Sequence, residues 1–172
     1  MIAKVAFVKV SILGGGMRFV FSLVLVLLMN TANADENMPV SCKPITVDGE
    51  SLMLSAEKPV LVMIHNQSKT DLWITHPVSD PSASAGWSSR LQAGNWSALA
   101  LDKESFELTC IESKPGHEQQ VPCTGVISAC RWSSITMPAQ TTGTFWAGED
   151  MSISALTAHL GSRGFELPAS SQ

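Results

Sequence analysis

The chain has 172 residues, 15% of them charged, and a formal net charge of −4 at pH 7. An acidic chain without a cluster of lysine and arginine is a poor binder of nucleic acid, because contacts with phosphate groups depend on those side chains. The same charge balance argues against attraction to anionic membranes, so neither nucleic acid nor a lipid surface is an expected partner.

Residues 1–34 have the features of a secretory signal peptide, and translation could also begin at Met17 within them. An arginine follows Met17, residues 19–29 form an apolar core, and Ala32 and Ala34 are the small residues expected before a cleavage site. The apolar core is too short for a transmembrane helix, which needs about 20 residues. We therefore expect export to the periplasm or to the outside of the cell, without stable membrane insertion after cleavage.

Cleavage after Ala34 would leave a single domain, residues 35–172, with a length of 138 residues. Without the three basic residues of the signal peptide, 8 lysines and arginines remain against 15 acidic residues, a net charge of −7. A domain of this length buries about 68% of the surface of its unfolded chain.

The four cysteines are expected to form two disulfides rather than to bind metal, because disulfides are stable in exported proteins. Cys123 and Cys130 lie too far apart along a helix or a strand to bond, unless the chain reverses tightly between them. We favour Cys110–Cys123, across the turn at Pro115-Gly116, together with Cys42–Cys130, which would hold the amino-terminal end. No metal or other cofactor is expected.

Short strands separated by turn signals are predicted in the first part of the domain. Residues 45–47 and 51–54 flank the dipeptide Asp48-Gly49, which is typical of the turn in a β-hairpin. Residues 59–64 are apolar without interruption and are bounded by turn formers, which predicts a central strand buried on both faces.

A strand, a loop and a candidate binding surface are predicted for residues 71–87. Residues 71–75 alternate and indicate a strand, whereas residues 76–86 are rich in proline and small residues and indicate a loop. Tryptophan in a small β-domain mostly belongs to the core. Trp87, beside the loop, is the tryptophan that we expect to be exposed, and Trp87 and His76 together form the predicted binding surface.

The clearest period-two alternation lies in residues 91–132. Residues 95–101 and 105–112 are both predicted strands, joined by a charged hairpin loop at residues 102–104, and a further strand-like run covers residues 131–137. In the second strand, the face expected to be buried carries Phe106, Leu108 and Cys110. In the first strand both faces are apolar, with Trp96, Ala98 and Ala100 on one and Leu99 and Leu101 on the other. The block predicts a β-meander joined by disulfides.

The tail predicts one helix of about ten residues, because apolar side chains recur at the spacing of a helix face, at Ile153, Leu156 and Leu160. Asp150 or Ser152 would cap its amino-terminal end, and Gly161 or Gly164 would end it. A short strand is expected to follow at residues 165–167.

Strands at intervals of about ten residues, separated by turn signals, favour an all-β sandwich. We therefore predict a mainly β fold: a disulfide-stapled antiparallel β-sandwich, immunoglobulin-like in architecture, with one short C-terminal helix. No motif predicts catalysis, because the four histidines lack the spacing of a zinc site and no G-x-S-x-G elbow occurs. The glycosylation sequons at Asn66 and Asn95 are interpreted as chance matches.

A series of framework motifs runs through most of the mature chain. In order they are Cys42, L-x-A-x-N-W-x-A from Leu91, F-x-L-x-C ending at Cys110, Cys123 with Cys130, G-x-F-W from Gly143 and R-G-F-x-L from Arg163. This order resembles the enhanced-entry EnhB-like family, small exported proteins of intracellular bacterial pathogens. The resemblance implies a periplasmic or secreted protein linked to host-cell entry or intracellular survival, and hence to virulence, with a Sel1-repeat envelope protein as a candidate partner. It implies no catalytic residue.

From these features we expect a non-catalytic interaction protein of the bacterial envelope that acts with a protein partner. The first alternative is an envelope carbohydrate-binding protein or enzyme with a tryptophan-lined cleft. The second alternative is a chaperone-like β-domain that binds a client strand, which would require a long uncharged edge strand.

Overall fold

The computed structural model describes residues 38–77, 87–102, 105–132, 135–138 and 143–168. All of them belong to one compact unit, residues 34–172. The predicted signal peptide, residues 1–34, lies outside the described residues, so its boundary stays a prediction.

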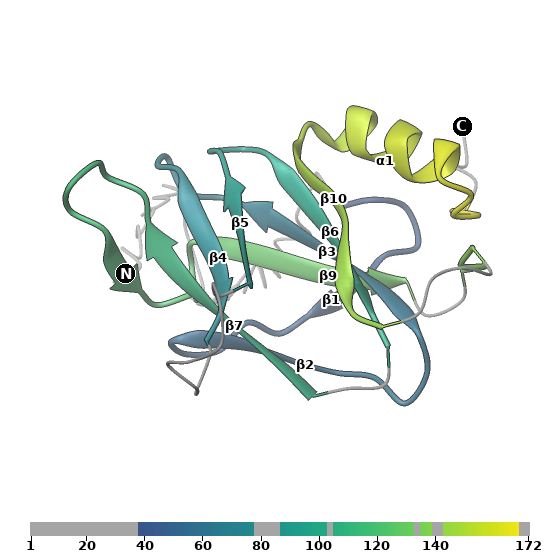
Figure 1. Cartoon of the computed structure of the whole chain (residues 1–172), viewed down its shortest axis with the longest axis horizontal. Helices are drawn as coiled ribbons and strands as arrows, with labels where there is room; N and C mark the ends of the chain where they lie inside the picture. The colour runs from purple at the N-terminus through teal and green to yellow at the C-terminus, as the bar shows by residue number, and fades with distance from the viewer. Residues whose placement is uncertain (1–37, 78–86, 103–104, 133–134, 139–142, 169–172) are drawn as a thin grey trace, which may run out of the picture. The chain divides into compact units, whose positions relative to one another are not determined.

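Two antiparallel sheets pack face to face, and one helix follows the last strand (Figure 1). The first sheet contains, in spatial order, β1 (Lys43–Ile45), β9 (Ile127–Trp132), β3 (Val60–Asn66), β6 (Trp96–Leu101) and β10 (Phe145–Met151). The second sheet contains β2 (Ser51–Ser55), β7 (Ser105–Glu112), β4 (Leu72–His76) and β5 (Trp87–Leu91), and β8 (Gln119–Val121) pairs with β7 beyond the end of β2. This architecture confirms the predicted mainly β sandwich with one short C-terminal helix.

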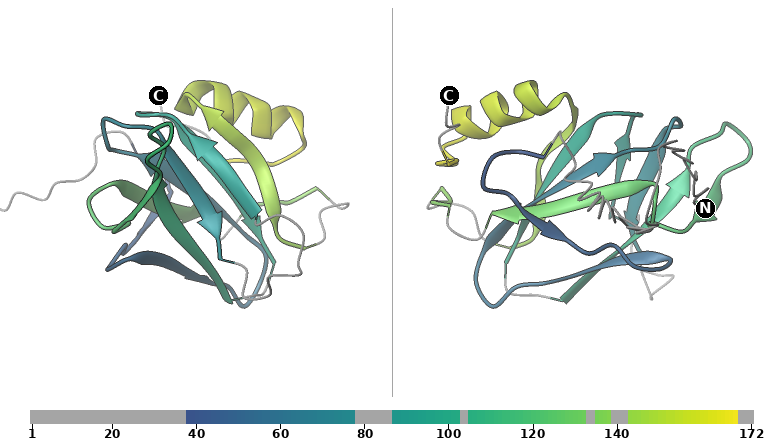
Figure 2. Two further views of the ribbon diagram at one scale, coloured as in Figure 1. Left: turned by 60° about the vertical axis from the view of Figure 1, so that its left-hand side comes forward. Right: turned by 180° about the vertical axis from the view of Figure 1, so that it is seen from behind.

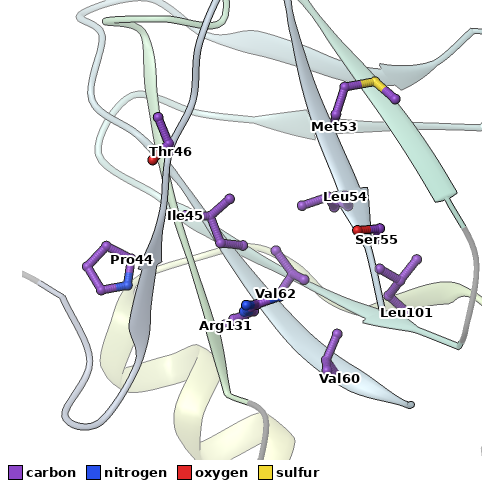
Figure 3. A pocket seen from close by; sticks show the side chains of 10 residues that line it. All are labelled: Pro44, Ile45, Thr46, Met53, Leu54, Ser55, Val60, Val62, Leu101 and Arg131. Carbon is purple, nitrogen blue, oxygen red and sulfur yellow. The ribbon is translucent and has the colours of Figure 1, made fainter. Parts of the chain in front are cut away.

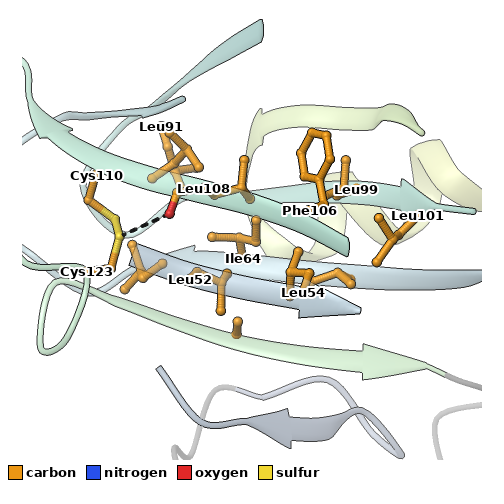
Figure 4. Packing of buried hydrophobic residues seen from close by; sticks show 14 of the residues in the cluster. Leu52, Leu54, Ile64, Leu91, Leu99, Leu101, Phe106, Leu108, Cys110 and Cys123 are labelled. Carbon is orange, nitrogen blue, oxygen red and sulfur yellow. Dashed lines mark hydrogen bonds between the residues drawn. A yellow bond between two sulfur atoms is a disulfide. The ribbon is translucent and has the colours of Figure 1, made fainter. Parts of the chain in front are cut away.

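The central strands β3 and β6 are buried on both faces, because they lie between two hydrophobic cores. On the side toward the second sheet, Ile64 and Leu99 belong to the same cluster as Leu52 of β2 and Leu108 of β7 (Figure 4). The opposite core contains Leu61, Met63, Trp96, Ala98, Ala100, Leu156 and Leu160. The predicted central strand and the predicted division of β6 into two apolar faces are both confirmed.

The helix α1 (Ile153–Ser162) covers the outer face of the first sheet, next to β10 (Figure 2). The hydroxyl oxygen of Ser152 caps it by accepting a hydrogen bond from the backbone N–H of Ala155 at 3.3 Å. Leu156 and Leu160 are completely buried against the sheet. The predicted helix and its Ser152 cap are confirmed. No helix in the described ranges is long and apolar enough to cross a membrane.

Both predicted disulfides are present. Cys110 of β7 is bonded to Cys123, with a Cα–Cα distance of 5.3 Å, inside the core between the sheets (Figure 4). Cys42 is bonded to Cys130 of β9, with a Cα–Cα distance of 5.5 Å, in the core on the outer face of the first sheet. The second bond holds the residue that immediately precedes β1, and therefore fixes the edge of the first sheet.

The two predicted hairpins and the predicted meander are wrong, because the chain changes sheet at these turns. Residues 46–50 lead from β1 in the first sheet to β2 in the second, and the strands on either side of residues 102–104 likewise lie in different sheets. Gly49 has a φ of +89°, which glycine adopts without strain, so the chain does turn there. A turn signal predicts where the chain reverses, but it does not say which sheet receives the next strand.

Two further strand boundaries near the carboxyl end differ from the prediction. β9 begins at Ile127, directly after a turn at Gly125 with a φ of +81°, and therefore precedes most of the predicted strand at residues 131–137. The predicted strand at residues 165–167 is reduced to an isolated bridge with Thr136. In both places the local apolar pattern indicated burial, but burial there comes from packing against the outer face of the first sheet.

Candidate functional site

The two residues of the predicted binding surface lie directly opposite each other in the second sheet. His76 ends β4, contrary to the predicted loop, because it pairs with Trp87 of β5. The His76 ring stacks on Phe106 with 4.1 Å between ring centroids, and its Nδ1 lies 2.7 Å from the carbonyl oxygen of Glu107. These contacts hold the end of β4 against β7. The Trp87 side chain and residues 78–86 lie outside the described residues, so binding at this surface stays a prediction.

Hollows lie at both ends of β3, and the one at its carboxyl end is built from polar loops and one tryptophan. It has a volume of about 410 Å³ and is lined by His65, Asn66, Gln67, Ser68, Gly94, Trp96, Ser152 and Ile153. The His65 ring stacks on Trp96 with 4.3 Å between ring centroids, and both residues are buried. A single buried tryptophan does not form the tryptophan-lined cleft of the first alternative.

Asn66 is completely buried in the wall of this hollow, and its side chain is saturated with hydrogen bonds. Its Nδ2 donates to the carbonyl oxygens of Thr70 at 2.8 Å and of Leu91 at 2.9 Å. Its Oδ1 accepts hydrogen bonds from the backbone N–H of Ser68 at 2.9 Å and from the Ser68 hydroxyl at 2.7 Å. The polar groups at this end of β3 therefore hold the loops of the domain together.

Asp150 fastens the same end of the sandwich from β10. Its Oδ1 accepts hydrogen bonds from the backbone N–H of Gln92 at 2.7 Å and from Nδ2 of Asn95 at 2.9 Å, and its Oδ2 accepts one from Nε2 of Gln92 at 2.7 Å. Burial on its own would raise the pKa of Asp150, but the hydrogen bonds from Asn95 and Gln92 outweigh it and lower the pKa below its usual value. Asp150, a candidate helix cap in the sequence, instead holds the connection at residues 92–95.

At the amino end of β3, a groove lies between the edges of the two sheets (Figure 3). Residues of β1 and β2 form its two walls, and β3, β6 and β9 contribute the residues between them. Its volume is about 230 Å³. It is lined by Pro44, Ile45, Thr46, Met53, Leu54, Ser55, Val60, Val62, Leu101 and Arg131. We call this hollow the seam groove.

One wall of the seam groove is an edge strand without any charged residue. β2, with the sequence SLMLS, is the last strand on its side of the second sheet. Leu52 and Leu54 are buried in the core between the sheets, whereas Met53 alternates with them and is 58% exposed. Natural sheets usually protect such edges with charged residues or proline. The opposite wall, β1, carries Pro44, but β2 has neither kind of residue.

The cysteines and histidines of the domain do not form one cluster. All four cysteines are in disulfides. The histidines occupy different places, His65 in β3, His76 at the end of β4, His117 between β7 and β8, and His159 in α1. In the part of the chain that the structure describes, no group of three or more His, Cys, Asp or Glu could hold a metal ion.

The fold and its two bonds define the class of this protein as a disulfide-bonded β-sandwich domain with an open seam at one edge. No protein-family model, no curated protein and no solved structure matches the chain. The resemblance to the enhanced-entry EnhB-like family therefore stays a prediction.

The sequence analysis missed the seam groove, although two signals for it exist. An alternating strand with methionine at its outward position and no charge, Ser51–Ser55, is one signal. The basic residues Lys43 and Arg131, which become neighbours in the first sheet, are the other. The predicted hairpin hides both, because a hairpin would pair β1 with β2 and leave no opening between them.

Proposed function

We propose that the protein is an exported, non-catalytic interaction protein and that it binds a partner protein through the seam groove. The proposal is based on one observation: the edge strands β1 and β2 of the two sheets both line the seam groove, and β2 carries no charge. An exposed edge strand accepts an extended segment of another chain through backbone hydrogen bonds. The apolar side chains beneath it would receive side chains of that segment.

The expected compartment is the periplasm or the outside of a bacterial cell. Disulfides persist in oxidising compartments, and two are present here. Residues 1–34 have the features of a signal peptide, which supports the same compartment. The resemblance to the EnhB-like family supports a link to host-cell entry or intracellular survival, and it makes a Sel1-repeat envelope protein the first partner to test.

A chaperone-like domain that binds client strands is the second candidate function, and the same strand edge favours it. β2 is uncharged, as such a function requires, but it has only five residues. A short edge beside a small groove suits one particular segment better than many long client strands. The two functions therefore differ in the number of partners.

Photo-cross-linking in cells tests the proposal. A photo-reactive amino acid replaces Met53 in the tagged full chain, and the exposed His117, which does not line the groove, is the control position. We expect one partner protein to be captured at position 53 and not at position 117. Many different proteins captured at position 53 would favour the chaperone-like function. Capture of no protein, or of the same proteins at both positions, would refute the seam groove as the binding site.

A further inference from the structure

On the basis of the proposed function, we infer that the segment bound in the seam groove is extended and carries a carboxylate side chain two residues from an aliphatic one. Three features of the groove carry this inference. They are a pair of cations in the first sheet, of which Arg131 lines the groove, the small volume between the walls, and the edge of β2, which pairs with no further described strand on that side.

The two cations are neighbours on one face of the first sheet. Lys43 of β1 and Arg131 of β9 lie directly opposite each other in an antiparallel pair. Residues in this relation project from the same face of a sheet. Because Arg131 lines the seam groove, Lys43 points toward the groove side as well. Like charges placed opposite each other repel and destabilise the pairing of the strands.

No described residue forms an ion pair with either cation. The ion pairs in the described ranges join Arg90 to Asp71 and Lys114 to Glu112. Lys43 and Arg131 are exposed, and the expected mature chain has a net charge of −7, so the pair does not reflect a generally basic surface. A carboxylate from a partner would relieve the repulsion, and a guanidinium group can bind a carboxylate through two hydrogen bonds.

The groove is too small for a typical free ligand, and its lining combines aliphatic residues with the polar residues Thr46, Ser55 and Arg131. Val60, Val62 and Leu101 are buried residues that line it (Figure 3). Its volume of about 230 Å³ lies below the range of about 300–1,000 Å³ that is typical of small-molecule pockets. One or two aliphatic side chains of a larger partner therefore suit it better than a whole small molecule.

The edge of β2 sets the spacing of the two groups. A segment that pairs with this edge extends the second sheet, and every second side chain then points toward the first sheet. Side chains on the same face of a strand are about 6.6 Å apart. An aliphatic and an acidic side chain at positions i and i+2 can thus fill the groove and approach Arg131 together. A second copy of β2, with the sequence SLMLS, offers no carboxylate and is a poorer complement.

Selection of peptides on the protein tests this chemistry. Random seven-residue peptides are selected on the purified mature chain with both disulfides formed. We expect the enriched peptides to carry Val, Ile or Leu and Asp or Glu at alternate positions. In a selected peptide, replacing the acidic residue with its amide should weaken binding up to about fivefold, the range of an exposed ion pair.

Two double variants with the same change of charge make the selection decisive. Lys43→Gln/Arg131→Gln should remove the preference for the acidic residue and keep the preference for the aliphatic one. Lys69→Gln/Lys114→Gln, at exposed positions that do not line the groove, should keep both preferences.

Several results would overturn the inference. Selected peptides without an acidic residue would do so, as would an acidic preference that survives in Lys43→Gln/Arg131→Gln. Saturable binding of a free fatty acid in the groove, or self-association that a Met53→Glu substitution abolishes, would identify another occupant. Either of the first two results, together with a partner captured at position 53, would refute only the carboxylate. Failure to capture a partner at that position would refute the proposed function itself.

Discussion

The two ends of β3 differ in what their polar groups do. At the carboxyl end, the side chains of Asn66 and Asp150 are hydrogen-bonded to loops of the same domain. At the amino end, the seam groove presents an uncharged strand edge and two cations that form no ion pair with a described residue. The polar groups of the first end stabilise the fold, and the second end is the proposed binding site.

If the proposal is correct, residues for stability and residues for binding lie at opposite ends of the same strand, β3. Substitutions at the carboxyl end of β3 should lower the free energy of unfolding and leave binding unchanged. Substitutions of exposed residues at the seam groove, such as Met53 and Arg131, should lower binding and leave stability nearly unchanged. The disulfide between Cys42 and Cys130 is the expected exception, because Cys42 immediately precedes β1 and the bond should therefore affect both.

The largest effect is expected from removing the Cys42–Cys130 disulfide. Its sequence separation is 88 residues, and the chain-entropy model then gives a loss of about 4.6 kcal/mol in the free energy of unfolding. Since Cys42 immediately precedes β1, the variant Cys42→Ala/Cys130→Ala should also lose binding at the seam groove. Denaturant unfolding and peptide binding measure the two effects.

The other disulfide provides the matched control for this variant. Cys110 and Cys123 are separated by 13 residues, which gives a loss of about 3 kcal/mol from chain entropy. Because neither of them holds β1, the variant Cys110→Ala/Cys123→Ala should keep its peptide affinity at temperatures where it remains folded. An equal loss of affinity in both folded variants would contradict the role of Cys42–Cys130 in the groove wall.

A smaller loss of stability is expected at the carboxyl end of β3. Asn66→Ala removes the side-chain donor to the buried carbonyl oxygen of Leu91 and the acceptor for the backbone N–H of Ser68, and it leaves the carbonyl oxygen of Thr70 with the Ser68 hydroxyl. These losses should lower the free energy of unfolding by about 3 kcal/mol. Urea unfolding measures this loss, and the exposed Gln119→Ala in β8 is the control that should change little. Peptide affinity at the seam groove should be unchanged in both variants, and a loss of affinity in Asn66→Ala alone would show that the two ends are coupled.

Acid should weaken the same end through Asp150. Because the pKa of Asp150 is lower in the folded protein than its usual value, the carboxylate stabilises the fold above about pH 4. That contribution is lost as the pH falls through the lowered pKa. We expect Asp150→Asn to be less stable than the wild type at pH 7, with a difference that shrinks toward pH 2.5 in urea unfolding. Glu112, whose pKa the hydrogen bond from Lys114 lowers, contributes equally in both proteins, so a constant difference would exclude this role of Asp150.

Local patterns predicted a strand or a helix correctly where one face of that element packs against a core, because the buried side chains then recur at regular positions in the sequence. The strand at Ser105–Glu112 and the helix at Ile153–Ser162 have the predicted alternation and the predicted spacing, because one face of each lies on a core. Both disulfides could also be predicted, since the short Pro-Gly loop made one pairing favourable and left one partner for Cys42.

Long-range choices could not be predicted from such patterns. The turn at Gly49 is in the expected place, but the next strand joins the opposite sheet, and this crossing opens the seam groove. The carboxylate of Asp150 depends on Gln92 and Asn95, which are 58 and 55 residues away in sequence. The change of sheet after Gly49 and the hydrogen-bond partners of Asp150 both depend on distant parts of the chain, so no periodic pattern within one segment predicts them.

The smallest change in stability is expected at the pair of cations, and it has the opposite sign. Arg131→Gln removes a repulsion with Lys43 and should raise the free energy of unfolding by about 0.3 kcal/mol, and Arg131→Glu should raise it by about 0.5 kcal/mol. Both gains should shrink in high salt, which screens exposed charges. Urea unfolding at low and high salt measures them, with the exposed Lys69→Glu as the control.

Peptide binding should change in the other direction in the same variants. Arg131→Gln and Arg131→Glu should weaken the binding of acidic peptides progressively, while Lys69→Glu should not. Loss of stability in both Arg131 variants would instead assign the side chain to the fold, as with Asn66. If the loss of the Arg131 side chain makes the domain more stable and weakens its binding, folding does not explain why an arginine stands at this position. Its place beside Lys43 is then explained by the partner that the two cations bind.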